Sequence, residues 1–168
     1  MDKDYIYNNI DIAQYYLSEF HLLAEGDPLI LDLCFLPPFK WKAYYMQIIG
    51  KNGAYKAPCA YTRYADIHGL ESCSQSFETV EKVDVLSHKK GDVICKIVDI
   101  DPKIVKTVTE QILSFEPAVV KNDGITIDGI FAAARLFQGG EMSKEIILTP
   151  KSDDSSLIKT MISVSEII

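Results

Sequence analysis

Residues 41–53, WKAYYMQIIGKNG, decide the fold class of this chain. The first nine positions are rich in aromatic and β-branched side chains, which favour a β-strand. Lys51, Asn52 and Gly53 follow, and an Asn-Gly pair accepts the positive φ angles of a tight hairpin turn. Because a hairpin joins antiparallel neighbours, this stretch predicts an antiparallel sheet.

Further strands are predicted on both sides of this hairpin, each bounded by turn-forming residues. The last two predicted strands are joined by the pair Gly139-Gly140. Between the first hairpin and the next strand, residues 55–76 hold Pro58, Gly69 and several small polar residues, which indicate an irregular segment with at most one edge strand. The other predicted strands are residues 29–36, 78–86, 92–100, 130–137 and 144–148, with a second hairpin turning at residues 87–91.

Three helices complete the predicted pattern. An N-terminal helix is expected from a cap at Asn8 or Asn9 to Gly26, with Ile10, Ala13, Leu17, Phe20 and Ala24 on its inner face. The clearest helix follows Asp101, a capping residue, and Pro102, which suits the first helical position. It ends at Pro117, with Ile104, Val108, Ile112 and Phe115 facing inward. A C-terminal helix is expected from Ser152 or Asp153, with Leu157, Met161, Val164 and Ile168 on one face.

This pattern predicts a single α+β domain over residues 1–168. We expect a mainly antiparallel sheet with the N-terminal, central and C-terminal helices packed on it, covering one face. The chain length fits one domain, because division would leave two marginal cores.

The composition narrows the class of function. Hydrophobic residues make up 48% and charged residues 24%, as in soluble globular proteins. The formal net charge of -7 repels nucleic-acid phosphates and permits a basic protein partner. No apolar run reaches the roughly 20 residues of a membrane span, and the polar N-terminus lacks a signal peptide. We therefore expect a cytoplasmic protein that binds neither nucleic acid nor membrane.

The sequence offers no motif for catalysis, a metal or a cofactor. The cysteines lack close pairing and are expected to be reduced thiols; Cys59, His68 and Cys73 have the only spacing that hints at a metal site, and a fourth ligand is missing. The pairs Asp99 with Asp101 and Asp153 with Asp154 suit helix starts as well as acid–base work. Asp123-Gly124 and Asp128-Gly129 lack the Lys and Ser/Thr of a phosphate-binding loop.

A group of aromatic residues is more informative. It has lysines and an arginine interleaved, and it supports three interpretations: half-buried strand aromatics, an exposed protein-binding patch, or a surface that stacks on single-stranded nucleic acid. The first interpretation is preferred on the sequence, and the second follows it. The aromatic residues are Trp41, Tyr44, Tyr45, Tyr55, Tyr61 and Tyr64.

The C-terminal quarter carries an ordered set of features. Asp128-Gly129 opens a strand, Gly139-Gly140 turns the chain, residues 146–150 (IILTP) give a second strand and a proline, and residues 157–168 form an apolar helix. This order resembles the tail of immunity proteins of bacterial polymorphic toxin systems. The resemblance implies a small cytoplasmic protein that binds a cognate toxin and blocks it. It identifies no toxin-contacting residue.

The leading functional hypothesis is therefore a non-enzymatic protein-binding domain, an immunity protein that occludes the active site of a toxin domain. The candidate contacts lie in the aromatic and acidic stretch: Tyr55, Tyr61, Tyr64, Asp66 and Glu71. Two alternatives stay open, a small hydrolase or transferase with dispersed catalytic residues and a structural or regulatory module of a larger assembly.

Overall fold

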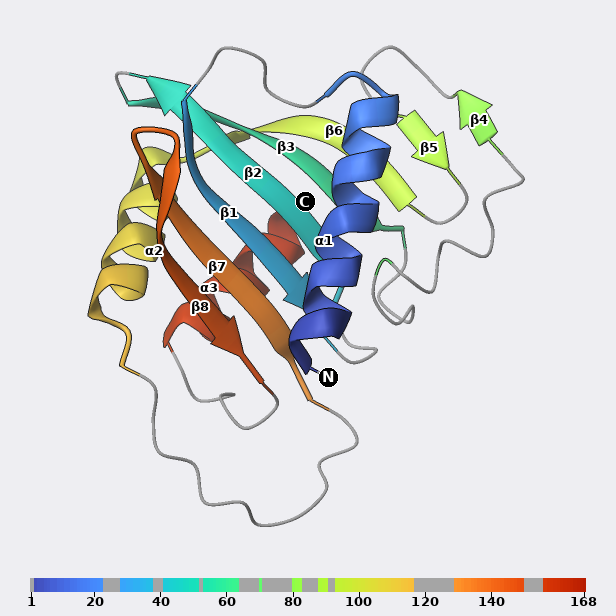
Figure 1. Cartoon of the computed structure of the whole chain (residues 1–168). Coiled ribbons are helices and arrows are strands. Elements are labelled where there is room, and N and C mark those ends of the chain that lie inside the picture. The colour runs from blue at the N-terminus through green and yellow to red at the C-terminus, as the bar shows by residue number, and fades with distance from the viewer. Residues whose placement is uncertain are drawn as a thin grey trace.

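The fold is an α+β sandwich built on one antiparallel sheet, as the computed structural model in Figure 1 shows. The structure describes residues 2–22, 28–37, 41–51, 53–63, 70, 80–82, 88–90, 93–116, 129–149 and 156–168. Among these, the strand order is β4-β5-β6-β3-β2-β1-β7-β8. The elements are α1 (Asp2–Glu19), β1 (Leu29–Leu36), β2 (Tyr44–Lys51), β3 (Ala54–Thr62), β4 (Val80–Lys82), β5 (His88–Lys90), β6 (Val93–Ile100), α2 (Pro102–Ser114), β7 (Phe131–Gln138), β8 (Glu141–Leu148) and α3 (Ser156–Ile167).

The predicted fold class is confirmed: six long antiparallel strands form the body of the sheet, and the N-terminal, central and C-terminal helices pack on it. Strand β1 has the bounds predicted from its sequence. Both predicted tight turns are present, with φ of 77° at Gly53 in the β2–β3 turn and φ of 61° and 83° at Gly139 and Gly140 in the β7–β8 turn. These angles are the ones that glycine adopts without a steric penalty.

The helices cover both faces of the sheet, so the expectation that they cover one face is wrong. In Figure 1, α1 crosses in front of the sheet and α3 lies behind it. The sheet has a hydrophobic core on each face, and alternate residues of β1 belong to one or the other. Leu31 and Leu33 lie in the core beneath α2 and α3. Cys34 and Leu36 lie in the core beneath α1. Successive strand residues point to opposite faces, and β1 is apolar at nearly every position, so both faces require a cover.

Strand β3 is the largest departure from the sequence prediction. It lies in the middle of the sheet between β6 and β2, where an irregular segment or an edge strand was expected. Proline is disfavoured in a central strand because it has no N–H to donate. The β2–β3 ladder accommodates Pro58 locally: paired residues resume on either side, at Met46↔Cys59 and Ile49↔Lys56, with the same register.

The second predicted hairpin is also corrected. The partner of β6 is the short strand β5, which falls inside the predicted turn. Strand β4 pairs with the other edge of β5. Lys90 pairs with Val93, so the chain reverses between these two residues. Residues 88–90, expected in the turn, instead pair with β6, where the ladder provides partners for their backbone groups.

Helix α1 starts earlier than predicted. Asn9 does not cap the helix: it is buried within it, and its side-chain amide donates to the carbonyl of Tyr5. Ile10, Ala13 and Leu17 face the core as expected, and Phe20 packs against it, whereas Ala24 and Gly26 lie outside the described residues.

The end of α1 uses a left-handed residue that is not glycine. His21 has φ of 57°, its N–H donates to the carbonyl of Ser18, and the N–H of Leu22 donates to the carbonyl of Leu17. These two hydrogen bonds define a Schellman motif, in which glycine is the usual left-handed residue.

His21→Gly is therefore expected to stabilise the protein, because glycine removes the steric cost of positive φ at this position. We expect a gain of roughly 0.5–1 kcal/mol in the free energy of unfolding, measured by chemical denaturation. The matched change Ser18→Gly, inside the helix, should instead cost about 0.5–1 kcal/mol. Destabilisation by both changes would show that the His21 side chain contributes more than its backbone strain costs.

Helices α2 and α3 follow the sequence closely. Asp101 caps α2 by accepting a hydrogen bond from the N–H of Lys103 at 2.9 Å, and Pro102 occupies the first turn. Val108 and Ile112 are buried as predicted, and Ile104 and Phe115 pack against the same core. On α3, Leu157, Met161 and Val164 are buried, while the predicted start at Ser152 or Asp153 lies outside the described residues.

Candidate functional site

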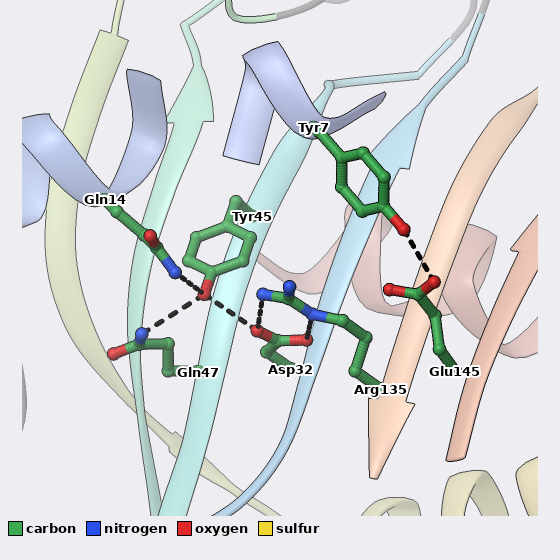
Figure 2. Close-up of polar contacts among 7 residues, drawn as sticks. All are labelled: Tyr7, Gln14, Asp32, Tyr45, Gln47, Arg135 and Glu145. Carbon is green, nitrogen blue, oxygen red and sulfur yellow. Dashed lines mark hydrogen bonds and ion pairs between the residues drawn. The ribbon is translucent and has the colours of Figure 1, made fainter. Parts of the chain in front are cut away.

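A row of polar residues crosses the sheet beside α1. The strand registers align Asp32 with Gln47 on one side and with Arg135 on the other, and Arg135 in turn with Glu145. Each pair shares a face of the sheet, since directly opposite residues of antiparallel strands point the same way. This polar row lies on the α1 face, where Figure 2 shows its side chains.

Asp32 is the centre of the row. Its side chain is 3% exposed, and its carboxylate accepts hydrogen bonds from two nitrogens of Arg135: Nε, at 2.8 Å, and Nη2. The hydroxyl of Tyr45 donates a third hydrogen bond to the same carboxylate, at 2.9 Å. A bidentate guanidinium and a hydroxyl together satisfy the buried charge, which would otherwise be very costly.

The Tyr45 hydroxyl links this ion pair to α1. It accepts hydrogen bonds from the side-chain amides of Gln14, on α1, and Gln47, on β2, at 3.0 Å and 3.1 Å (Figure 2). Burial raises the pKa of Tyr45 well above its ordinary value, and the neighbouring Asp32 carboxylate raises it further. Tyr45 therefore stays a neutral donor to Asp32 and is unsuited to act as a base near pH 7.

Arg135 is held as a cation. Its hydrogen bond to Asp32 raises the pKa of the guanidinium above its already high value, against the opposing effect of burial. The guanidinium carbon also lies 5.9 Å from the centre of the Phe137 ring, within cation–π range.

A second contact ties α1 to the sheet edge. The Tyr7 hydroxyl donates to Oε1 of Glu145 at 2.6 Å (Figure 2). This hydrogen bond raises the pKa of Tyr7, with burial as the next cause. The Tyr7–Glu145 and Gln14–Tyr45 hydrogen bonds together hold α1 against the sheet, so the polar row and the tyrosines bonded to it have a structural role.

The structure describes two of the five predicted partner-binding residues, Tyr55 and Tyr61. Tyr61 is 5% exposed and belongs to the core beneath α2 and α3, with the ammonium groups of Lys42 and Lys96 at 5.3 Å and 5.2 Å from its ring centre. Its buried ring offers little surface to a partner. Tyr55 is half-buried, and Tyr64, Asp66 and Glu71 lie outside the described residues.

The other aromatics of the same stretch are mostly internal. Tyr44 and Tyr45 are fully buried, and Trp41 packs against the core. The interpretation as strand aromatics holds for Tyr44 and Tyr45, which lie on β2 but are fully buried where half-burial was expected, whereas Trp41 precedes that strand. Successive residues of β2 point to opposite faces of the sheet, and a helix covers each face.

Tyr55 lines a cleft at the end of the sheet. The cleft has a volume of about 460 Å³ and lies between the β2–β3 turn and the junction of β6 with α2. Lys56 and Asp99, on neighbouring strands, are cross-strand partners, and both are exposed. The cleft is lined by Ile49, Gly50, Gly53, Ala54, Tyr55, Lys56, Asp99, Ile100 and Pro102.

The candidate metal set is not assembled in the described part of the chain. Cys59 is fully buried in the core, and burial raises the pKa of its thiol, whereas His68 and Cys73 lie outside the described residues. No group of three or more His, Cys, Asp or Glu side chains suited to a metal occurs among the residues described. Cys34, Cys59 and Cys95 form no disulfide.

Comparison with known proteins adds no functional information, so the function of this chain is inferred from the geometry of the described residues. No family model, curated protein or solved structure matches this chain. In the described segments, no helix is long and apolar enough to cross a membrane.

Sequence reasoning missed the polar row. Asp32 and Arg135 are 103 positions apart, and no local motif joins them. The available signal was a single charge in each of two apolar strands, LILDLCFL and FAAARLFQ. A charge at such a position must be paired if the strand is buried on both faces.

Proposed function

We propose that this chain is a protein-binding domain, an immunity protein that binds a cognate toxin domain and occludes its active site. Of the contacts predicted from the sequence, Tyr55 is retained, and the exposed Lys56 and Asp99 of the same cleft are added to it. The partner is a protein with a basic contact region.

One observation carries the proposal: the cleft at the β2–β3 turn combines the half-buried Tyr55 ring with two exposed charges. Tyr55 is the predicted contact residue that retains surface among those described, and it lies in a concavity. Lys56 and Asp99 form no ion pair within the described residues, so both can bind groups of a partner. An aromatic wall with adjacent charges is typical of an interface hot spot.

The polar row supports the same function. The Asp32 carboxylate binds the Arg135 guanidinium and the Tyr45 hydroxyl. The same hydroxyl binds Gln14 and so holds α1 against the sheet. Such a satisfied network gives a rigid scaffold, which lowers the entropic cost of binding a partner. The net charge of -7 also favours fast association with a basic protein.

The test is co-expression with the protein encoded by the adjacent reading frame, which this proposal expects to be the toxin domain. We expect growth protection and a stable complex, and we expect Tyr55→Ala to weaken binding by more than about 1 kcal/mol in a titration of the purified toxin domain. The matched control is Tyr15→Ala, on α1, where the tyrosine is 58% exposed and lies outside the cleft. Its effect should stay within about 0.5 kcal/mol.

Two outcomes would contradict the proposal. Failure of the neighbouring toxin domain to form a complex or to be neutralised removes the immunity function. Equal losses in Tyr55→Ala and Tyr15→Ala, with both variants folded, would place the contact outside the cleft.

A further inference from the structure

Gly50 differs from the turn glycines of this protein. Among the described residues, the glycines at positive φ are Gly53, Gly139 and Gly140, which lie in hairpin turns, whereas Gly50 lies inside β2. Glycine weakens the interior of a strand because it has no side chain to pack, and its presence there often marks the close approach of another group. The neighbours of Gly50 are therefore expected to show why a side chain is absent.

Tyr55 occupies the space that a side chain at position 50 would need. The two residues are cross-strand partners in the β2–β3 hairpin and share the face of the sheet beneath α2. A Cβ atom added to Gly50 would lie 2.7 Å from Cδ1 of the Tyr55 ring and 3.1 Å from its Cα, and nearer still to the carbonyl oxygen of Ala54. Ordinary contacts between carbon atoms are about 3.5–4.0 Å. The Tyr55 ring is thus seated directly on the backbone of Gly50.

Two further contacts hold this arrangement. On the other side of β3, Tyr55 pairs with Ile100, a core residue that is 5% exposed. On β2, the N–H of Gly50 donates to the carbonyl of Pro28 at 3.4 Å, which ties this point of the strand to the residue before β1. The ring is bounded by a glycine on one side and a buried isoleucine on the other, so few rotamers are open to it.

This packing also shapes the proposed binding cleft, because Gly50, Tyr55 and Ile100 all line it. A side chain that is already immobile loses little conformational entropy when a partner covers it, and such preorganisation raises affinity without adding a contact. An alanine at position 50 would displace the Tyr55 ring or the start of β3, and so change the cleft wall.

We infer that Gly50 is a positioning residue of the cleft: its missing side chain seats the Tyr55 ring and fixes the cleft wall before a partner arrives. The inference rests on the proposed function for what the ring contacts. The seating itself is a property of the free protein, so it can be tested without a partner.

The free protein tests the seating of the ring by NMR. An aromatic ring shifts the resonances of protons packed against it, so the Hα resonances of Gly50 should move clearly in Tyr55→Leu. This variant leaves Gly50 in place and keeps an apolar side chain against the core. The Hα resonances of Gly139, in the other hairpin, should stay where they are in the wild type.

Binding tests whether the seating matters to the partner, and the probe is the protein encoded by the adjacent reading frame. We expect Gly50→Ala to weaken binding by about fivefold or more, because it displaces the Tyr55 ring. In a Tyr55→Ala background the same change should add less than about twofold, since no ring remains to be displaced. A general weakening of the hairpin would instead give similar losses in both backgrounds.

Gly139→Ala is the matched control for lost stability. Gly139 has φ of 61° in the β7–β8 turn and lies outside the cleft. Apart from its chain neighbours, no described residue lies within 4 Å of the Cβ that alanine would add. Alanine there strains a turn without moving the cleft wall, so the denaturation midpoint should fall while binding changes by less than about twofold.

Three results would overturn the inference: Hα resonances of Gly50 that do not respond to Tyr55→Leu, equal binding losses in Gly50→Ala and Gly139→Ala, or a loss from Gly50→Ala that adds in full to that of Tyr55→Ala. If Gly50→Ala does not fold, the Hα resonances decide. A wild-type chain that does not bind the neighbouring protein would refute the proposed function, and the resonances would still show whether Gly50 seats the ring.

Discussion

Asp32→Ala is expected to destabilise the protein by about 3–5 kcal/mol, because it leaves the Arg135 guanidinium without its buried partner. The Tyr45 hydroxyl loses its acceptor at the same time, although it still accepts from Gln14 and Gln47. The free energy of unfolding from urea denaturation measures the effect. The matched control is Asp11→Ala, an exposed acid on α1, which should change stability by less than about 0.5 kcal/mol.

A double variant distinguishes the free-energy cost of leaving Arg135 unpaired from the net contribution of the ion pair to the free energy of unfolding. Asp32→Leu combined with Arg135→Met removes both charges, and it should be more stable than Asp32→Ala alone. A loss below about 1 kcal/mol in Asp32→Ala would contradict the assignment, since it would mean that water solvates Arg135 as well as Asp32 does.

Ile112→Ala is expected to cost about 2–5 kcal/mol, the range for an emptied core position. Ile112 is 0% exposed in the core beneath α2 and α3. Its neighbour Leu113 provides a control of equal size on the same helix, because the Leu113 side chain is 58% exposed. Leu113→Ala should change the free energy of unfolding by less than about 0.5 kcal/mol. Similar losses in the two variants would show that the facing of α2 differs from the structure.

The candidate partner-binding residues show that local sequence patterns do not predict which strand residues are exposed. Tyr55 and Tyr61 are equivalent in the sequence, as aromatic residues six positions apart in a segment with turn-forming residues. In the structure, Tyr61 contributes to the core and Tyr55 lines the cleft. The difference arises because Tyr61 aligns with Tyr44 beneath the packed helices, whereas Tyr55 aligns with Gly50 beside the turn. Exposure of a strand residue depends on what covers that point of the sheet, which periodicity does not encode.

The sequence by itself determined the features that depend on a few adjacent residues. Asp101 and Pro102 begin α2, glycines at positive φ turn the β2–β3 and β7–β8 hairpins, and the apolar run 29–36 gives β1 its bounds. Capping, turn conformation and strand propensity act within one or two turns of the chain, so they can be recognised without the fold. These signals were sufficient for the α+β class and the antiparallel sheet.

Only the tertiary structure decided which elements became neighbours. It placed β3 in the centre of the sheet despite Pro58, put α1 on the face opposite α2 and α3, and paired Asp32 with Arg135. These outcomes depend on strand order and register, which are set by burying both faces of the sheet at once. That burial is a collective free energy of many distant contacts, and no single stretch of the sequence carries it.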